Sequence, residues 1–225
     1  MSSIREIPMP SEHRGFLVAF EGIDGAGKTT QARLLRESLS AAGYDSVALK
    51  EPTLGEWGRK VSMMSKEGRT LTPRQEFEYF YEDRKEDVRE HINPALSKGQ
   101  VVILDRYYYS NIAYQGARGL DQKFIEYENL KIAPKPDLVI ILDIDSTTAK
   151  HRIVKIRKDQ PNHFEQRLGP VRNIFLKMKE KPEVVIIDGN KPVSEIHSSV
   201  LELVLPMVKS RLEKNVVEFS RRNTT

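Results

Sequence analysis

The chain has 225 residues, of which 39% are hydrophobic and 30% charged, and its formal net charge is +4. This length and composition are typical of a globular protein with one α/β domain or two small ones. Cysteine is absent, which excludes disulfides, thiolate metal sites and a cysteine nucleophile and favours a cytoplasmic location. The longest apolar runs have the length of strands, so we expect no membrane span.

The beginning of the chain and one internal segment differ in composition from the rest. Residues 1–14 carry prolines and charges where a signal peptide has an apolar centre, so we expect a flexible leader. Between Lys150 and Pro182, ten Lys or Arg residues stand against three Asp or Glu, while the remainder is slightly acidic. Such a basic segment can be a solvated helix face, a nucleic-acid surface or a site for a small polyanion.

Five short apolar runs alternate with helical patterns along the chain. They cover residues 16–20, 46–50, 101–105, 137–142 and 183–188. Continuous apolar strands that alternate with helices are typical of a parallel sheet covered on both faces. We therefore predict an α/β fold of three layers, with a five-stranded parallel sheet flanked by helices. It forms a single domain over residues 15–215, and a tail follows over 216–225.

Capping residues and helical spacing predict where the helices lie. The longest begins at Thr72 and Pro73 with Gln75 three residues after the cap, which is a capping box with proline at the first helical position. It runs to about residue 97, bends at Pro94 and stops at Gly99. Further helices are predicted over 58–66, 121–132, 146–158, 164–180 and 193–213.

The segment FEGIDGAGKTTQ, residues 20–31, lies between a predicted strand and a predicted helix. It contains the pattern GxxxxGK[ST], whose glycines turn backbone N–H groups toward phosphate oxygens at the positive end of the helix dipole. The alternative is a chance glycine turn before a helix. We predict a P-loop NTPase fold in which ATP is bound by Gly22, Asp24, Gly25, Ala26, Gly27, Lys28, Thr29 and Thr30.

A carboxylate at the end of a neighbouring strand would complete this site by holding a magnesium-bound water. Asp105 ends the run at 101–105, and Asp143 ends the next predicted strand and is its rival. A strand-end aspartate that merely caps a turn is a further alternative. We expect Mg²⁺ as the cofactor, with the Thr29 hydroxyl and Asp105 as its protein site.

The nature of the phosphoryl acceptor follows from what the chain lacks and carries. A GTPase would need the motif NKxD, but here NKPV places Val193 at the aspartate position. A small chain with its own arginines in a mobile basic segment favours a kinase for a small acceptor, because a closing lid excludes water from the transferring group. We place this lid at about residues 152–166.

The motifs FEGIDGAGKTTQ, EPT, FYEDR, DRYYYSNIAYQG and HFEQR occur in the order and spacing of thymidylate kinases. The chain resembles this family over roughly residues 15–205, and the segment at 105–117 is the most diagnostic. The resemblance implies Mg²⁺-dependent transfer of the ATP γ-phosphoryl group to dTMP, giving dTDP for dTTP synthesis. It also implies a homodimer.

The resemblance assigns roles to residues of the long helix and the phosphate loop. It implies that Asp24 accepts a hydrogen bond from the sugar 3′-hydroxyl, although a loop-stabilising role is the alternative. Phe77, Phe80 and Arg84 share one helix face, where an aromatic pair by itself is more often part of a core. The resemblance implies instead that Phe80 stacks on thymine and that Arg84 contacts the base or the phosphate.

The segment after Asp105 is implied to bind the acceptor nucleotide. Arg106 becomes a ligand of the monophosphate, a role that suits the fork geometry of a guanidinium. Ser110, Tyr114 and Gln115 are implied to read the base edge and to crowd the 2′ side of the sugar. Ordinary packing and capping are the alternatives for these three residues.

The EPT segment matches the start of a family motif and then departs from it. Glu51 begins the motif, but TLGEWGRK replaces the commoner glycine-rich continuation, and Arg59 is our candidate for a second clamp on the acceptor phosphate. The predicted substrate-binding set is therefore Asp24, Glu51, Arg59, Phe80, Arg84, Arg106, Ser110, Tyr114 and Gln115.

Neutralising the transition-state charge requires a further cation. One subgroup of the family carries a basic residue inside the phosphate loop, whereas this loop has none at its variable positions, residues 23–26. We predict that Arg152 and Arg157 supply the charge, because such an arginine can contribute roughly 10³ to 10⁵ in rate. Lys155, Lys158 and Arg167 are alternates. The predicted catalytic set is Lys28, Arg106, Arg152 and Arg157.

Two other functions remain open from the sequence. A kinase for another deoxynucleotide, such as dUMP, or for a deoxynucleoside would use the same motifs. A nucleotide-binding regulator or RNA-binding module would instead use the basic segment as its contact surface. We expect ATP and dTMP as partners, and neither nucleic acid nor membrane.

Overall fold

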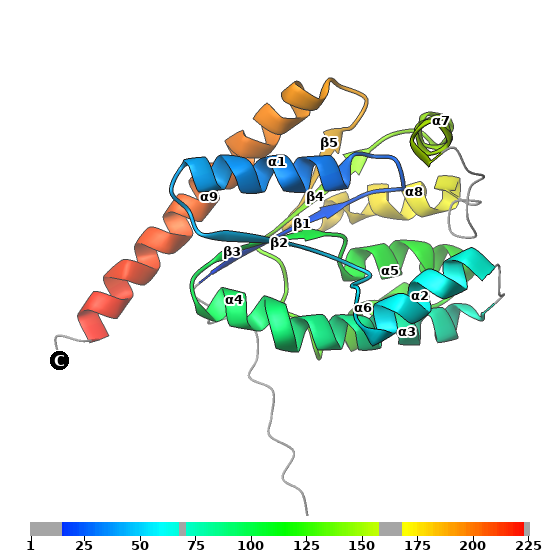
Figure 1. Cartoon of the computed structure of the whole chain (residues 1–225), viewed down its shortest axis with the longest axis horizontal. Helices are drawn as coiled ribbons and strands as arrows, with labels where there is room; N and C mark the ends of the chain where they lie inside the picture. The colour runs from blue at the N-terminus through cyan, green and yellow to red at the C-terminus, as the bar shows by residue number, and fades with distance from the viewer. Residues whose placement is uncertain (1–14, 68–70, 158–167, 223–225) are drawn as a thin grey trace, which may run out of the picture.

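A computed structural model describes residues 15–67, 71–157 and 168–222 of the chain (Figure 1). Its centre is a five-stranded sheet with the order β2-β3-β1-β4-β5, in which every paired neighbour is parallel. The strands are β1 Phe16–Glu21, β2 Ser46–Lys50, β3 Val101–Asp105, β4 Leu138–Asp143 and β5 Val184–Asp188. The predicted parallel sheet of five strands is confirmed.

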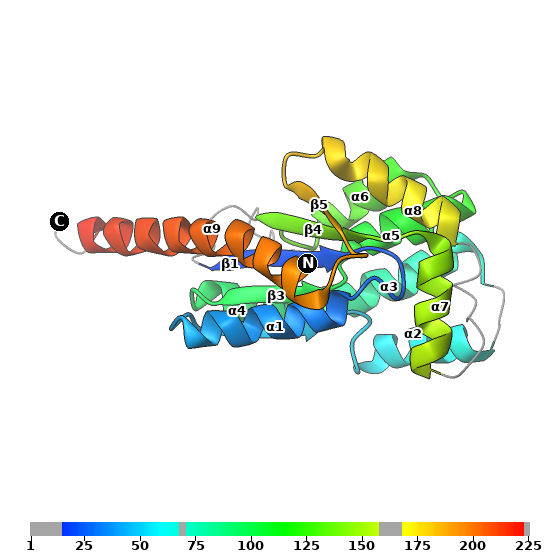
Figure 2. The ribbon, with the colours of Figure 1, turned by 90° about the horizontal axis from the view of Figure 1, so that it is seen from above.

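Helices cover both faces of this sheet, as predicted. One face is covered by α1 Lys28–Ala41 and α9 Val193–Arg222 (Figure 1). The opposite face carries α3 Pro73–Asp87, α4 Asn93–Ser97, α5 Tyr108–Tyr114, α6 Gln122–Leu130 and α8 Leu168–Lys177. In both views α2 Glu56–Glu67 and α7 Ser146–Arg157 lie at the end of the molecule toward which the strands point (Figures 1 and 2).

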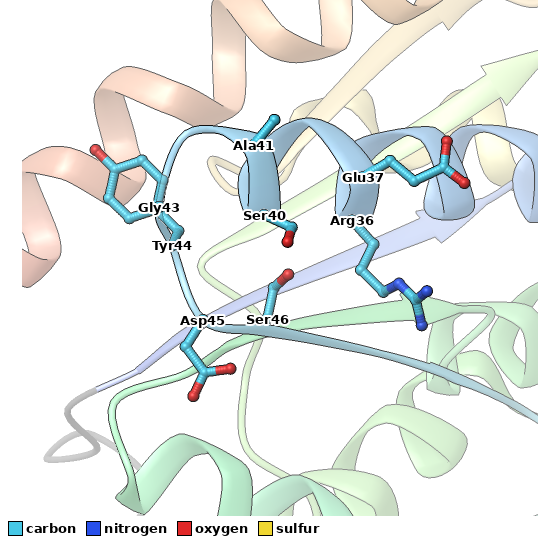
Figure 3. Close-up of a pocket in the computed structure, with 8 residues that line it drawn as sticks. All are labelled: Arg36, Glu37, Ser40, Ala41, Gly43, Tyr44, Asp45 and Ser46. Carbon is cyan, nitrogen blue, oxygen red and sulfur yellow. The ribbon is translucent and has the colours of Figure 1, made fainter.

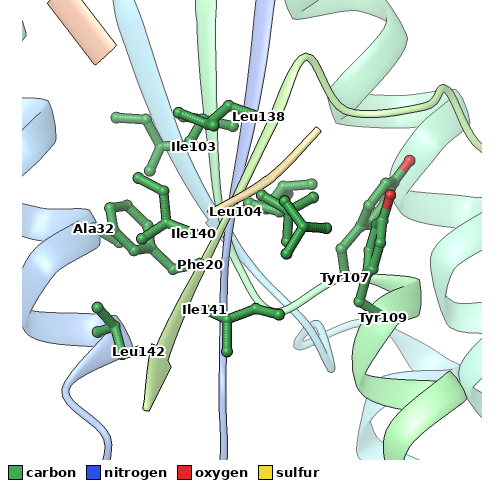
Figure 4. Close-up of a cluster of buried hydrophobic side chains, with 14 of the residues drawn as sticks. Phe20, Ala32, Ile103, Leu104, Tyr107, Tyr109, Leu138, Ile140, Ile141 and Leu142 are labelled. Carbon is green, nitrogen blue, oxygen red and sulfur yellow. The ribbon is translucent and has the colours of Figure 1, made fainter. Parts of the chain in front are cut away.

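The core follows from the continuous apolar strands. Side chains of a strand alternate between the two faces of a sheet, and in β1, β3 and β4 both faces are buried. Figure 4 shows Phe20 and Ile140 between α1 and the sheet, with Tyr107 and Tyr109 on the other side. Burial on both faces therefore fixes the middle of the sheet, where β1 carries the phosphate loop at its end.

The long helical segment begins as predicted and contains a π-helical turn just before Pro94. The capping box is confirmed, since Thr72 Oγ1 accepts a hydrogen bond from the Gln75 amide and the Gln75 side chain accepts one from the Thr72 amide. In the turn at Val88–Ile92, which the sequence did not predict, the Asn93 amide donates to the Val88 carbonyl. Proline cannot donate to the preceding turn, and the wider π turn accommodates it.

Two other helix boundaries differ from the prediction. The last helix was predicted to end at 213, but α9 continues to Arg222, because no glycine or proline follows Pro206 to stop it. The helix predicted at 164–180 is described as α8 and a 3₁₀ turn at Met178–Glu180, and its first residues lie outside the described part of the chain. Among the described residues, no helix is long and apolar enough to cross a membrane.

The strand order places the site at the carboxyl edge of the sheet. β1 lies between β3 and β4, and the chain leaves β1 first toward β2 and β3 on one side and later toward β4 and β5 on the other. In parallel α/β sheets, ligands bind in the crevice outside the carboxyl ends of the strands where the order reverses in this way. The loops after β1, β3 and β4 meet at this edge.

Candidate active site

The phosphate loop, residues 22–29, follows β1 and leads into α1. Gly27 has a left-handed φ of 103° and precedes α1 without a side-chain cap. The first amides of α1 are therefore available to an anion, which the helix dipole also favours. At Gly22, with φ 128°, an added Cβ would lie 2.4 Å from the carbonyl oxygen of Leu142. Only glycine allows the loop to lie this close to β4.

Lys28 is the cation of the phosphate loop. Its ammonium group is buried and donates hydrogen bonds to the carbonyl oxygens of Gly22, at 3.0 Å, and Ile23, at 2.8 Å. Burial and the neighbouring charge of Arg106 lower the pKa of Lys28 to about 8. The ammonium group consequently keeps its charge at neutral pH, as binding a phosphate requires.

The two residues predicted to hold Mg²⁺ are in contact. Thr29 Oγ1 donates a hydrogen bond of 2.5 Å to Asp105 Oδ2, and Lys50 Nζ lies 3.6 Å from the same carboxylate oxygen. The rival, Asp143, is engaged elsewhere, because Arg172 donates to both of its carboxylate oxygens at 2.7 and 2.8 Å. Of the two candidate carboxylates, Asp105 is the one whose side chain contacts the phosphate loop.

The donor set at this position fits a magnesium ion. Mg²⁺ prefers oxygen ligands and is usually held by one or two protein groups together with water and substrate phosphates. The Thr29 hydroxyl and the Asp105 carboxylate are such groups. Within the described residues no cluster of three or more His, Cys, Asp or Glu side chains forms a closed metal site, so a metal at Thr29 would depend on the nucleotide for its other ligands.

Arg106 occupies a strained position at the end of β3. Its φ of 77° is left-handed, which is unusual for a residue other than glycine. Its guanidinium donates to Ser110 Oγ at 2.9 Å and to Asp24 Oδ1 at 2.7 Å, and Tyr114 donates its hydroxyl to Asp24 Oδ2 at 2.8 Å. We call Asp24, Arg106, Ser110 and Tyr114 the acceptor cluster.

Charge holds the acceptor cluster together. Burial opposes ionisation of Asp24, but the charges of Arg106 and Lys28 lower its pKa well below the usual range. Arg106 Nη1 also approaches the carbonyl oxygen of Gly22 at 3.5 Å, and this is the oxygen that Lys28 contacts. The phosphate loop and the acceptor cluster therefore share one side of the molecule.

Glu51 and Arg84 are brought together, but in the interior. Arg84 is 1% exposed, and it donates to Glu51 through Nε at 3.1 Å and through Nη2. Its Nη1 donates to the side-chain oxygens of Asn111 and Asn129, each at 2.6 Å. The structure thus engages the Arg84 guanidinium with protein acceptors just after β2 and on α5 and α6.

The remaining predicted acceptor residues differ in their surroundings. Phe80 is half-buried on α3, whereas its neighbour Phe77 packs in the core against Phe124. Gln115 is fully buried, accepts a hydrogen bond from Asn111 and donates to Glu76. Arg59 is exposed on α2 and takes no part in the contacts of the acceptor cluster.

Of the predicted basic residues of α7, Arg152 reaches the phosphate loop. Its guanidinium donates to the Gly189 carbonyl at 3.1 Å through both terminal nitrogens and lies 3.4 Å from the Gly25 carbonyl. Lys155 is exposed. The side chain of Arg157 and the predicted lid from 158 onward, with Lys158 and Arg167, lie outside the described residues.

Sequence reasoning missed Glu21, which precedes the phosphate loop. Its side chain is fully buried and accepts hydrogen bonds from the Tyr107 and Ser110 amides at 2.8 and 3.1 Å and from the Ser110 hydroxyl at 2.6 Å. The available indication was a charged residue at the end of an otherwise apolar strand. Asn111, which contacts Arg84, was also missed.

An open groove lies at the other end of α1, where the chain turns into β2 (Figure 3). Because α1 begins at Lys28 and rises about 1.5 Å per residue, the first lining residue, Arg36, lies about 12 Å along the helix from the phosphate loop. None of the predicted site residues lines it. Its lining residues are Arg36, Glu37, Ser40, Ala41, Gly43, Tyr44, Asp45 and Ser46.

The chain is similar to thymidylate kinases along most of its length. The family model described as Thymidylate kinase matches residues 20–200. A probable thymidylate kinase from Archaeoglobus fulgidus is 44% identical over 199 residues, which are 88% of this chain and 100% of that protein. Thymidylate kinases from Xylella fastidiosa strain M12 and Xanthomonas oryzae pv. oryzae are 41% and 42% identical over 200 residues, covering 88% of this chain and 90% and 86% of the relatives.

Proposed function

Because the chain belongs to the thymidylate kinase family, it phosphorylates dTMP to dTDP with ATP as donor, and we propose that the cations at the Gly22 carbonyl carry this transfer. Lys28 and Arg106 both contact that oxygen. This observation supports a donor site and an acceptor site that face each other. The comparisons do not favour the alternatives of another deoxynucleotide, a deoxynucleoside or a nucleic acid as the main ligand.

On the donor side, the phosphate loop binds the polyphosphate of ATP through main-chain amides, and Lys28 binds its outer phosphates. When bound at Thr29 and Asp105, Mg²⁺ neutralises charge on the phosphate oxygens. The Asp105 carboxylate, which accepts the Thr29 hydroxyl, would serve there as a ligand of the ion.

On the acceptor side, Arg106 binds the monophosphate while Asp24 accepts a hydrogen bond from the sugar 3′-hydroxyl. Tyr114 then holds Asp24 in place through the hydroxyl that already contacts it. Phe80 stacks on the base, and Arg84, Glu51 and their partners shape the wall beside it. In this proposal Gln115 acts from the interior, and Arg59 acts as the second phosphate clamp.

The reaction is a direct displacement that needs no protein nucleophile. An anionic oxygen of dTMP forms a bond to the γ-phosphorus of ATP, and the bond from that phosphorus to the β,γ-bridging oxygen breaks, leaving ADP. No proton has to move at neutral pH. The protein contributes position and positive charge, and Arg152, with Arg157 as the second candidate, supplies charge to the transferring group from α7.

We further propose the assembly and organisation that are typical of this family. The enzyme is a cytoplasmic homodimer whose protomer is a single kinase domain over residues 15–215, with a lid at 152–166. The basic segment serves the polyphosphate and not a nucleic acid. Sedimentation of the purified chain tests the dimer, and a monomer at micromolar concentration would contradict it.

A coupled assay for ADP formation tests the function. The chain is supplied with ATP and, in turn, with dTMP, dUMP, dCMP and thymidine, with and without Mg²⁺ removal by EDTA. We expect the highest kcat/KM for dTMP and loss of activity with EDTA that added Mg²⁺ restores. Faster turnover of dUMP or thymidine, or turnover that EDTA does not change, would contradict the substrate or the metal assignment respectively.

A further inference from the structure

Glu21 contacts the acceptor cluster without belonging to it. It ends β1, its side chain is fully buried, and it accepts hydrogen bonds from three donor groups of the segment that follows β3. The partners stand 86 and 89 positions later in the chain. Burial raises the pKa of Glu21, while the Ser110 hydroxyl and the charge of Arg106 oppose that shift.

The two main-chain contacts of Glu21 replace a missing helix cap at the start of α5. Helix α5 begins after Tyr107, whose side chain makes no capping hydrogen bond. Glu21 Oε1 instead accepts the amides of Tyr107 and Ser110, and Ser110 is the third residue of α5, where a capping oxygen normally binds. A carboxylate at a helix N-terminus is also favoured by the dipole. The start of α5 is therefore fixed from β1.

The same end of β1 also holds the backbone of Arg106. Its left-handed φ of 77° costs on the order of 1–3 kcal/mol and persists only if the surroundings impose it. The Arg106 amide donates to the Phe20 carbonyl at 3.0 Å, and the next amide, of Tyr107, donates to Glu21 Oε1. Both amides that flank the strained dihedrals are thus held by the end of β1.

The contact of Glu21 with the Ser110 hydroxyl connects it to the Arg106 guanidinium. A serine hydroxyl has one proton and two acceptor positions. Because the Ser110 hydroxyl donates its hydrogen bond to Glu21 Oε2 at 2.6 Å, the oxygen of Ser110 accepts from Arg106 Nη1 at 2.9 Å. An acceptor at Oε2 therefore sets the direction of the hydrogen bond that orients the guanidinium.

We propose that Glu21 is the positioning residue of Arg106, setting its strained backbone through two amides and its guanidinium through Ser110. The proposal rests on the proposed role of Arg106 as the ligand of the acceptor phosphate. Glu21 itself does not touch the substrate in this arrangement. Its loss should therefore weaken use of dTMP more than use of ATP.

Glu21→Gln tests this with little change of shape. The amide oxygen of Gln can still accept the two main-chain amides, but the NH₂ group cannot accept the Ser110 hydroxyl proton. We expect kcat/KM for dTMP to fall by about 10- to 100-fold, because small displacements of a positioning group have effects of this size. In the same variant, the KM for ATP should change by less than about threefold.

Glu183→Gln is the matched control. Glu183 is another buried carboxylate that anchors α5, since it accepts the Tyr109 hydroxyl at 2.7 Å, but it has no contact with Ser110 or Arg106 among the described residues. Thermal melting of both variants measures how much each weakens the fold. If Glu183→Gln lowers kcat/KM for dTMP as much as Glu21→Gln does, Glu21 has only a structural role and the proposal is wrong.

Ser110→Ala tests the relay even if Glu21→Gln fails to fold. Ser110→Ala removes the hydroxyl and leaves both amide contacts of Glu21, so it should reduce kcat/KM for dTMP. If Glu21→Gln folds, the double variant Glu21→Gln/Ser110→Ala should lose no more kcat/KM than the worse single variant, because both changes break the same chain of contacts. Unchanged kinetics of Ser110→Ala, or fully additive losses, would overturn the relay through Ser110.

Arg106→Ala separates this inference from the proposed function. If Arg106→Ala loses dTMP turnover while Glu21→Gln keeps it, the positioning role is wrong and the proposed function stands. If Arg106→Ala retains normal dTMP kinetics, the role of Arg106 itself fails. A loss in Glu21→Gln that affects ATP and dTMP equally would also overturn the positioning role.

Discussion

The phosphate loop and the acceptor cluster differ in how far apart in the chain their partners lie. Lys28 contacts carbonyls five and six residues before it. Arg106 contacts Asp24 and Gly22, which precede it by 82 and 84 residues. A local motif can build the first site almost by itself, whereas the second exists only after β1 and β3 have paired. The contacts of Lys28 are thus local, whereas those of Arg106 depend on the pairing of β1 with β3.

Arg152 gives the strongest test of this comparison, because it is a residue distant in the chain that contacts the phosphate loop. Its guanidinium reaches the Gly25 carbonyl from α7, 127 residues away. If it neutralises the transferring group, Arg152→Ala should lower kcat by about 10³-fold or more. Single-turnover kinetics at saturating substrates measure the effect, and Arg157→Ala is the companion. A normal rate in Arg152→Ala with a large loss in Arg157→Ala would move the role to the second arginine.

Lys28→Ala tests the local side itself. Removing one preorganised cation or donor from a transition-state site costs about 10²- to 10³-fold in kcat, and we expect an effect of that size with a folded protein. Steady-state kinetics and circular dichroism check both parts. Near-normal turnover would show that the loop binds phosphate without its lysine.

Arg106→Ala tests the side assembled by the sheet. The loss should fall on kcat/KM for dTMP, by about 10²-fold, because the variant misplaces or releases the acceptor phosphate. Arg106→Lys keeps the charge but loses the fork that reaches Asp24 and Ser110 together, so it should recover only part of the activity. Full recovery in the lysine variant would mean that charge alone is needed.

The pH dependence of ATP use sharpens the contrast between the two cations. Lys28 is charged below its pKa of about 8 and loses its proton as the pH rises through that value. The kcat/KM for ATP, which reports the free enzyme, should therefore fall above pH 8 by about tenfold per unit. The residual activity of Lys28→Arg should lack this fall, since arginine stays charged. A profile that is flat to pH 10 would contradict the assignment.

Tyr114→Phe should give the smallest effect. It removes the hydroxyl that donates to Asp24 at 2.8 Å and leaves the ring against Phe175. The expected cost is about 1 kcal/mol of unfolding free energy, together with a rise of a few-fold in the KM for dTMP. Urea unfolding and initial rates measure these quantities. A loss as large as that of Arg106→Ala would show that Tyr114 binds substrate directly.

Particular elements show how far the sequence could be interpreted. The capping box at Thr72 depends on residues three positions apart, and the structure confirms it. The π turn before Pro94 could not be predicted. A proline indicates that a helix is interrupted, but a kink, a π turn or a helix end can each accommodate it. Helix α9 was predicted too short because its last turns lack a repeated apolar pattern, although nothing in them stops a helix.

The sequence by itself determined the parallel sheet, the phosphate loop and its lysine, because strand length, helix caps and glycine positions act over a few residues. It also placed Asp105 and Arg106 next to each other at the end of a strand. Only the tertiary structure decided that Asp105 and not Asp143 lies beside Thr29, that Arg84 pairs with Glu51 in the interior, and that Glu21 reaches Ser110. Those contacts join segments that meet only when parallel strands align their carboxyl ends. No pattern within a few residues determines which distant segments come together.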